Sequence, residues 1–304
     1  MLTLKEMVSD FRNHLDAVGD NFFGDAEIVR RLHAAQQEIC RGIQKEDPTF
    51  YVATKVLDLV ADQATYSLPL NARLGSRIIF AQNTALSYGG LVPATVLEAL
   101  VDFEIPSVVN LTDQWHFTVQ GDKVRVMQTP GSSNSGAITI WYVPTHGNML
   151  QGKPSSATST TLVASTSQLT PDYTAYYGTL DRRDDYYNGM NITILDGTGV
   201  GQTRTISDYA GSTRTLTVDT AWTTTPDTTS EFYVTCPVPE DHHHLVPVRA
   251  ALTGSVKNRN RQQELAREYY GSPGRLGELA ELLSWVSKRQ ESRLETVMPA
   301  DLGD

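Results

Sequence analysis

Carboxylates that could act as an acid and base pair occur together at one place in the chain. Asp181, Asp184 and Asp185 could supply the two carboxylates of a glycoside hydrolase, which stand about 5 to 9 Å apart. Arg182 and Arg183 interrupt them in a polar stretch, a pattern more typical of a solvated loop. The sequence contains no Gly-x-Ser-x-Gly element, Walker loop, His-Glu-x-x-His or paired Cys-x-x-Cys motif. We therefore predict no catalytic residues and a protein that is not an enzyme.

Two further segments carry residue types that bind ligands. Residues 197–202 have the glycines of a phosphate-binding loop, but a strand-like segment follows them, so a hairpin turn is favoured over a nucleotide site. The run 242–244 consists of histidines, and neighbouring helical positions point about 100° apart, which prevents joint chelation of one ion. Glu240 and Asp241 are better suited to the first turn of the helix that follows, where negative charge is favourable. We predict neither a metal nor a cofactor.

A basic, tyrosine-bearing segment near the C-terminus is the best candidate for a binding surface. Arginine and tyrosine anchor protein interfaces when they become desolvated. A solvated helix face is the alternative for the charged residues, and a core position is the alternative for the tryptophan of the last predicted helix. The residues assigned to partner contacts are Lys257, Arg259, Arg261, Arg267, Tyr269, Tyr270 and Trp285.

Composition excludes several classes of protein. The chain has 304 residues, of which 40% are hydrophobic and 20% charged, as in soluble globular proteins of about two domains. The net charge of −10 is a poor fit to a protein that wraps DNA phosphates. No run approaches the roughly 18 apolar residues that cross a bilayer. Charged Lys5, Glu6 and Asp10 argue against a secretory signal, so we expect the chain to stay in the cytoplasm. Cys40 and Cys236 predict two buried thiols.

Helical periodicity marks both ends of the chain. Thr3 and Glu6 have the spacing of a capping box before an amphipathic helix. A second helix is predicted with Asp25 as its N-cap and an end at residues 47–48. Helical period returns in the C-terminal part of the sequence, where a last helix is predicted from Arg275 to about Leu294.

Period-two alternation between these ends predicts an antiparallel sheet. A hairpin turn is predicted at Gly121-Asp122, and one short helix over residues 94–103. The strands are predicted at 52–60, 64–69, 77–82, 115–120, 123–128 and 137–144.

A Ser/Thr-rich zone follows, over about 154–234, with no lysine between Lys153 and Lys257. Alternating β-branched and polar residues over 191–222 predict a small all-β meander within it. The fold class is therefore α+β: terminal helices packed with a central antiparallel sheet, plus an inserted all-β barrel or sandwich. The predicted domains are 1–153 for the first part of the core, 154–235 for the inserted module, and 236–304 for the C-terminal helices and tail. Long insertions into loops cost little chain entropy.

Short motifs in this order resemble the head-to-tail adaptor proteins of tailed bacteriophages. After the N-terminal helices come a D-Q-x-x-Y-x-L-P element, a hairpin that begins with a tryptophan, and a strand that ends in Tyr-Val-Pro. Residues 259–283 resemble the closing helices of that family and of phage tail tubular proteins, and residues 186–209 resemble a β module of phage structural proteins. The motif residues are Asp62, Gln63, Tyr66, Leu68, Pro69, Trp115, Pro130, Tyr142, Val143 and Pro144.

The resemblance implies a structural virion protein at the neck between head and tail, assembled in the host cytoplasm. About twelve copies would form a ring that joins the portal to a tail or nozzle protein, away from any membrane. DNA would pass through the lumen without specific binding, because acidic walls repel phosphate. Residues 257–304 are expected to dock onto the portal, and the partner residues named above to contact the portal or a neighbouring subunit. The inserted module is expected on the outside of the ring, against capsid, fibres or a neighbouring copy.

The alternative function is a carbohydrate- or receptor-binding phage tail protein. Aromatic side chains in the Ser/Thr-rich module could stack on sugar rings, although the chain lacks the heptad stalk of fibrous receptor-binding proteins. A cell-wall hydrolase is disfavoured for want of a convincing acid and base pair. The aromatic residues concerned are Tyr173, Tyr176, Tyr177, Tyr186, Tyr187 and Trp222.

Overall fold

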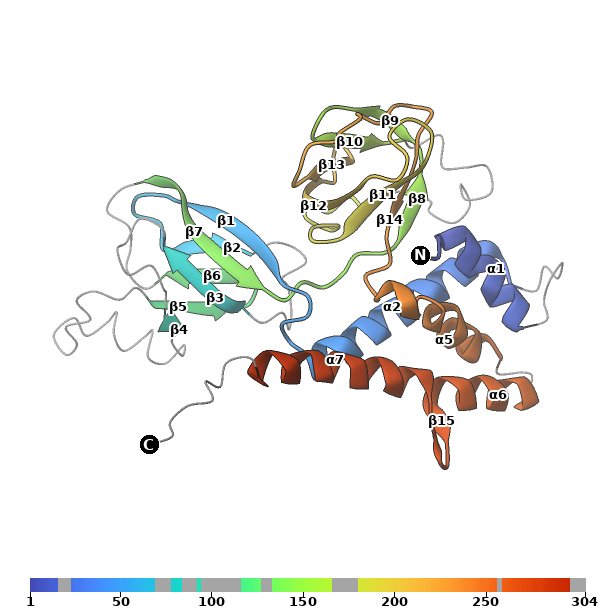
Figure 1. The fold of residues 1–304 in the computed structure, drawn as a ribbon. Coiled ribbons are helices and arrows are strands. Elements are labelled where there is room, and N and C mark those ends of the chain that lie inside the picture. The colour runs from blue at the N-terminus through green and yellow to red at the C-terminus, as the bar shows by residue number, and fades with distance from the viewer. Residues whose placement is uncertain are drawn as a thin grey trace, which may run out of the picture.

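The computed structural model combines helices from both ends of the chain with strands from its middle (Figure 1). It describes residues 1–15, 23–68, 78–83, 92–93, 116–126, 133–165, 180–255 and 259–295. Buried apolar side chains form one cluster centred on the helices and two among the strands. This mixture of helices and largely antiparallel sheets agrees with the predicted α+β class.

The first helix, α1 (Leu4–His14), begins at the predicted capping box. The amide of Glu6 donates to Thr3 Oγ1 at 3.3 Å, and the amide of Thr3 donates to Glu6 Oε2 at 2.7 Å. The second helix, α2 (Asp25–Glu46), differs from the prediction at its start, because Gly24 is the N-cap and Asp25 is already helical. The carbonyl of Gly24 accepts the amides of Glu27 and Ile28, which makes Gly24 the first residue to bond into the helix.

The C-terminal part consists of the short 3-10 helix η2 (Glu240–His242) and the helices α5 (Leu245–Gly254), α6 (Arg259–Tyr270) and α7 (Glu278–Glu295). The predicted acidic first turn is therefore wrong for α5, since Glu240 and Asp241 lie in η2 instead. The last helix begins three residues later than Arg275, because residues 271–276 form a hairpin of strands β15 (Gly271–Ser272) and β16 (Arg275–Leu276). Gly271 and Gly274 adopt positive φ angles of 90° and 84°, which interrupt the helical path.

The helices pack together around α5, which is apolar on nearly every side. Such a helix is typical of a protein interior. It contacts both α1 and α2, while α7 contacts α2 and α6. Its buried residues are Leu245, Val246, Pro247, Val248, Ala250, Ala251 and Leu252.

The middle of the chain forms two small sheets instead of the single sheet predicted. One has the order β1-β7-β3, with β1 (Ala53–Leu59), β3 (Ile78–Asn83) and β7 (Asn134–Tyr142) all antiparallel. The other has the order β2-β6-β5-β4, with β2 (Thr65–Ser67), β4 (Val92–Pro93), β5 (His116–Gln120) and β6 (Lys123–Val126). The β4–β5 pair is parallel, a further difference from the prediction.

One buried cluster joins the two small sheets. Phe117 and Val126 of one sheet belong to the same apolar cluster as Ile138 and Ile140 of the other. Two separate sheets arise because each alternating strand has only one apolar face, and burying those faces against each other excludes more water than a single open sheet would. Gly121, with φ of 63°, lies in the turn between β5 and β6, as the hairpin prediction requires. The helix predicted over 94–103 lies outside the described residues.

The remaining strands form a sheet that closes on itself. Its order is β8-β14-β11-β12-β13-β10-β9, and β8 and β9 at the two ends of this order are separated in sequence by Lys153 alone. The continuous segment 150–157 therefore pairs with β14 through one half and with β10 through the other. The two ends of the strand order are thus joined through one continuous stretch of chain, which closes the sheet into a barrel. The strands are β8 (Leu150–Gly152), β9 (Pro154–Ala157), β10 (Thr161–Ala164), β11 (Asn191–Asp196), β12 (Thr203–Ala210), β13 (Thr215–Val218) and β14 (Glu231–Val234).

Candidate docking surface

Helix α6 carries most of the predicted partner residues and turns one face to the helical core. Leu265 is buried on this face, whereas Arg267 on the opposite side is exposed. Arg261 donates from Nε to the backbone oxygen of His14 at 2.5 Å and from Nη1 to Glu264 at 3.0 Å. A cation at this carbonyl compensates the partial negative charge at the end of α1. Arg261 thus holds two helices of the same chain together.

Tyr269 is a core residue and not a surface anchor. Its side chain is fully buried in the helical cluster, with its ring edge-on to Tyr270 at 4.8 Å between centroids and the Arg249 guanidinium 5.8 Å from its centroid. Burial raises the pKa of its hydroxyl, which has no hydrogen-bond partner among the described residues. The Tyr269 side chain therefore offers no surface to a partner.

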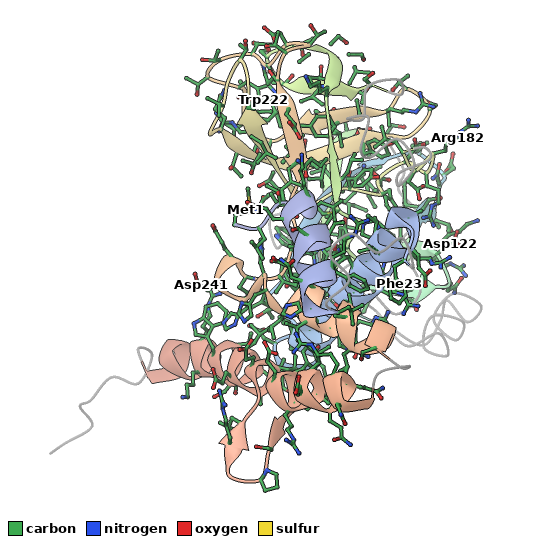
Figure 2. The ribbon with its side chains drawn as sticks, turned by 90° about the vertical axis from the view of Figure 1, so that its right-hand side faces the viewer. Met1, Phe23, Asp122, Arg182, Trp222 and Asp241 are labelled. Carbon is green, nitrogen blue, oxygen red and sulfur yellow. The ribbon has the colours of Figure 1, made fainter. Side chains whose placement is uncertain are left out.

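Tyr270 lies beside the β15–β16 hairpin and is 56% exposed. The hairpin projects from the junction of α6 and α7, at the end of the molecule opposite the closed barrel (Figures 1 and 2). Leu276 on β16 is 68% exposed. The last helix predicted from Arg275 would have included Leu276, which is wrong, because helical periodicity alone does not reveal where a glycine breaks the helix. The Ser-Pro-Gly sequence before it was the available signal for a turn.

Trp285 of α7 lies at the margin of the core and is 42% exposed. Its ring centroid is 6.1 Å from those of Phe50 and His242. The guanidinium of Arg289 stands 5.1 Å from both the Trp285 and the Phe50 rings, a cation–π arrangement at the surface. One part of the Trp285 ring thus packs against its own chain, and the rest faces solvent, where a partner contact stays a prediction.

The side chains of two predicted contact residues are not described by the structure. Lys257 lies outside the described residues, and Arg259 is described only as the first residue of α6. The structure therefore brings Arg267 and Tyr270 together on one exposed helix face, adds Leu276 beside them, and places Trp285 further along α7.

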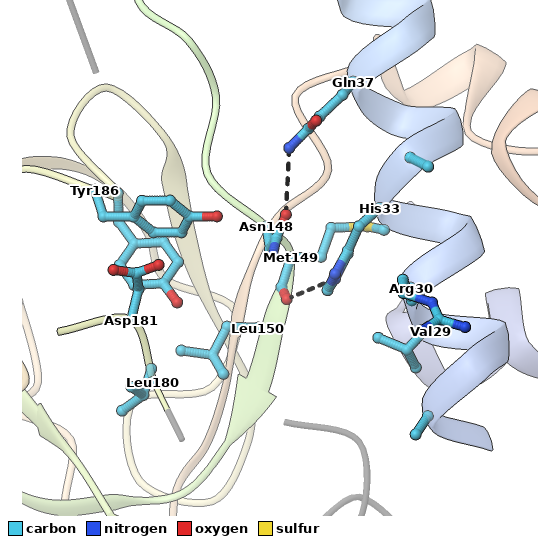
Figure 3. Close-up of a pocket in the computed structure, with 13 residues that line it drawn as sticks. Val29, Arg30, His33, Gln37, Asn148, Met149, Leu150, Leu180, Asp181 and Tyr186 are labelled. Atoms are coloured by element: carbon cyan, nitrogen blue, oxygen red, sulfur yellow. Dashed lines mark hydrogen bonds between the residues drawn. The ribbon is translucent and has the colours of Figure 1, made fainter. Parts of the chain in front are cut away.

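A cleft of about 450 Å³ lies between α2 and the closed barrel (Figure 3). Val29 and His33 of α2 line one side, and Leu180, Asp181 and Tyr186 line the other. His33 Nε2 donates to the carbonyl of Met149 at 3.2 Å, and burial lowers the pKa of His33 to about 4, so its imidazole is neutral. Asp181 is engaged by Arg183 at 2.6 Å, and hydrogen bonds from Arg183 lower the pKa of that carboxyl. His33 and Asp181 are thus each engaged in hydrogen bonds within the chain.

The segment that enters the barrel, residues 143–149, runs along α2 and is hydrogen-bonded to it. Gln44 Nε2 donates to the carbonyl of Pro144, and Gln36 Nε2 to the carbonyl of Gly147, both at 2.9 Å. A side chain at Gly147 would meet Tyr186 O at 2.6 Å, so glycine is needed where this segment passes the barrel. The exit segment is held as well, because Tyr51 donates its hydroxyl to the carbonyl of Pro237 at 2.9 Å. Both connections thus position the barrel against the helices.

The glycine-rich segment 197–202 forms a turn, and Asp184 and Asp185 make contacts within the chain. Gly197, Gly199 and Gly201 have positive φ angles in the turn between β11 and β12, as expected for a hairpin. Asp184 Oδ1 accepts the amide of Gly211 at 2.8 Å, and Asp185 lies 3.4 Å from Lys55 Nζ.

The histidine run serves the packing of the helices. His243 Nδ1 accepts the amide of Leu2 at 3.2 Å, and its Nε2 donates to the carbonyl of Val238 at 2.8 Å. His244 pairs with Glu278 at 2.5 Å. Within the part of the chain that the structure describes, no cluster of three His, Cys, Asp or Glu side chains is placed to hold a metal ion.

The aromatic residues of the barrel that the structure describes offer little surface for stacking on sugars. Tyr187 and Trp222 are buried, and Tyr186 is half-buried with Arg183 4.7 Å from its ring centroid. The other three, Tyr173, Tyr176 and Tyr177, lie outside the described residues.

Comparison with known proteins identifies one family. Residues 2–152 match the family described as SU10 adaptor protein, which confirms the resemblance to phage adaptors. This range covers α1, α2, both small sheets and the segment that enters the barrel. No curated protein matches the chain. Among the described residues, no helix is both long and apolar enough to cross a membrane.

Proposed function

Since residues 2–152 belong to the SU10 adaptor protein family of phage structural proteins, we propose that this chain forms the adaptor ring that joins the portal to the tail. The family match is the observation that carries the proposal, because it covers the whole N-terminal half. Members of such a family associate with portal and tail components at the virion neck. The ring would leave a lumen for DNA, and the net charge of −10 per chain would keep phosphates from adhering to its wall.

We assign the parts of the chain to separate roles within this ring. Residues 1–153 and 236–304 form the adaptor core, and residues 154–235 form a module set into it. The separate apolar cluster of the barrel supports this division, since a unit with its own core can be inserted without disturbing its host. The strand pairing of residues 150–152 with β14 favours an N-terminal boundary slightly before 154.

The exposed part of α7 and the residues that follow it are proposed to dock onto the portal. Trp285 and Arg289 form an aromatic and cationic surface, and these are residue types that bind strongly when a partner excludes water. The sequence after α7 carries two aspartates in its last four residues, and we propose that it contacts the portal as well.

Retention on portal-containing particles tests this docking. Deletion of residues 290–304, and separately Trp285→Ala, are each expected to release the protein from purified particles, measured by immunoblot after gradient centrifugation. Val200→Ala, an exposed change on the barrel, is the matched control and should be retained. Full retention of both altered proteins would contradict portal docking through α7.

Assembly itself is tested by electron microscopy. Purified chain mixed with portal should produce additional annular density on one face of the portal ring in negative-stain averages. Portal rings that look identical with and without the chain would contradict the adaptor function.

A further inference from the structure

Five of the nine exposed large apolar side chains in the described part of the chain lie on two separate surfaces. The first follows one face of strand β1. Val56 lies on this strand and is 52% exposed, and the exposed Val52 and Val60 flank the strand on the same face. Asp58 lies on the same face between two of these valines, and Asp62 follows the strand in an exposed turn. We refer to these five residues as the β1 surface, which is apolar with an acidic margin.

The second surface is formed by Tyr270 and Leu276 with the exposed Arg267 and Arg275, and we refer to it as the hairpin surface. It is apolar with a basic margin, although the chain as a whole is acidic. The two surfaces lie far apart on the molecule, because the hairpin projects away from the sheet that contains β1 (Figure 1). They therefore do not cover each other within one chain.

Both surfaces are held in place by local contacts. Asp58 Oδ1 accepts hydrogen bonds from the amide of Gly136 at 2.6 Å and from Ser135 Oγ at 2.9 Å, which tie β1 to the start of β7. At the base of the hairpin, Gly271 and Gly277 approach so closely that a side chain on Gly277 would stand 2.2 Å from the Gly271 nitrogen. Preorganised surfaces lose little conformational entropy on binding.

We propose that the hairpin surface of one copy packs against the β1 surface of the next copy. The pairing matches apolar side chains with apolar side chains and places Arg267 and Arg275 near the acidic margin of β1, so the charges are complementary. Because the two surfaces are different patches of one chain, the contact is head-to-tail, and repetition of such a contact closes a ring when its rotation fits. The proposal rests on the adaptor ring proposed above and names the residues through which neighbouring copies meet.

Disulfide trapping tests the contact directly. The native Cys40 and Cys236 are buried, so a cysteine introduced at the surface has little competition. Val56→Cys and Leu276→Cys proteins, mixed and oxidised on portal-containing particles, are expected to give a cross-linked dimer on a non-reducing gel. The double variant is expected to give a ladder of higher oligomers. Val200→Cys paired with Leu276→Cys is the control and should remain monomeric, since Val200 lies on the barrel.

Charge substitutions provide a second measurement. Arg275→Asp is expected to reduce the Val56–Leu276 cross-link several-fold, and Arg275→Lys to preserve it, because only the first reverses the charge facing the β1 surface. Arg275 is exposed on the hairpin, so neither change alters a buried contact.

Three outcomes would overturn the proposal. Dimers from a single cysteine variant alone would indicate a symmetric contact, a cross-link from Leu276→Cys to the portal would make the hairpin a portal surface, and no cross-link in any mixture would exclude the contact. Oxidation of the same two cysteine variants at high concentration without portal tests the contact between copies independently of the adaptor function. A ladder there, combined with no binding to portal, would support the contact between copies and contradict only the adaptor role.

Discussion

At the scale of single residues, burial decides the chemistry of several polar side chains. His146 lies in the segment that enters the barrel, with its ring edge-on to Tyr51 at 4.3 Å between centroids. Neither of its ring nitrogens has a hydrogen-bond partner among the described residues, and burial lowers the pKa of His146 to about 4. A neutral imidazole is thus required for the native packing at this position.

His146 should make the folded chain sensitive to acid. Its pKa is about 4 in the folded state and about 6.5 when unfolded, so the unfolded state binds more protons between these values. The contribution of His146 to the free energy of unfolding is fully present above pH 6.5 and falls as the pH drops toward 4. At pH 5 the loss from this group is about 2 kcal/mol. Urea unfolding at pH 7 and pH 5 should show a smaller pH difference for His146→Phe than for the natural chain. An identical pH difference in both proteins would contradict the burial of a neutral imidazole.

Tyr269 provides a test of the assignment to the core. Tyr269→Phe is expected to leave the melting temperature unchanged or slightly higher, because the buried hydroxyl has no partner among the described residues. Tyr269→Ala should cost about 3 to 5 kcal/mol through the cavity that it leaves. Thermal melts of the two variants check this, and a large loss with phenylalanine would mean that the hydroxyl makes an essential contact.

At the scale of elements, short non-periodic segments determine how helices and strands are arranged. The hairpin of residues 271–276 separates α6 from α7 and presents Leu276 to solvent. The segment 143–149 is held along α2 by hydrogen bonds from two glutamine side chains. In the sequence these glutamines are typical of a solvent-exposed helix face. In both cases a short connecting segment determines where the neighbouring helices or strands lie.

The base of the hairpin should tolerate no side chain. Gly277→Ala would place a carbon 2.2 Å from the Gly271 nitrogen and 2.3 Å from the Tyr270 carbonyl carbon, so the hairpin must shift. We expect a loss of about 1 to 3 kcal/mol in urea unfolding. Gly274→Ala is the matched control, since nothing lies within 4 Å of the added carbon and only the positive φ opposes it, at about 1 kcal/mol. Equal losses for the two variants would contradict the close crossing at Gly271 and Gly277.

At the scale of the whole molecule, three apolar clusters correspond to three structural units. The helical cluster collects residues from both ends of the chain and includes Met149 and Tyr233 from the margins of the barrel. The barrel has its own cluster and, through the segment 150–157, a closed ring of strand pairs. The barrel therefore meets the physical requirements for folding by itself, while the helices need both chain ends.

The barrel should fold as an isolated fragment. Residues 148–236 with Tyr233→Thr, which removes the aromatic ring that packs on the helices, are expected to give a β-type circular dichroism spectrum and one cooperative urea transition. Ile192→Asp in the same fragment is the control and should abolish the transition, because Ile192 is fully buried in the barrel cluster. A fragment that stays unfolded without the helices would show that the barrel depends on the helical core.

Local sequence patterns were enough to predict many of the helices and strands, and also the family. Capping at Thr3, the strand alternation and the glycine turns depend on neighbours only a few residues apart, so local patterns were sufficient to predict them. The short motifs between residues 62 and 144 were sufficient to indicate the adaptor family that residues 2–152 match.

Which apolar faces meet could not be predicted from the sequence and is seen in the folded chain alone. The division of the strands into two sheets, the closure of the barrel by residues 150–157, and the burial of Tyr269 beside an exposed Tyr270 all depend on partners distant in the chain. An amphipathic pattern predicts that one face of a helix or strand is buried, but it does not indicate which distant element packs against that face. The choice of that element follows from packing the whole chain at once, and this choice leaves the hairpin and β1 surfaces exposed.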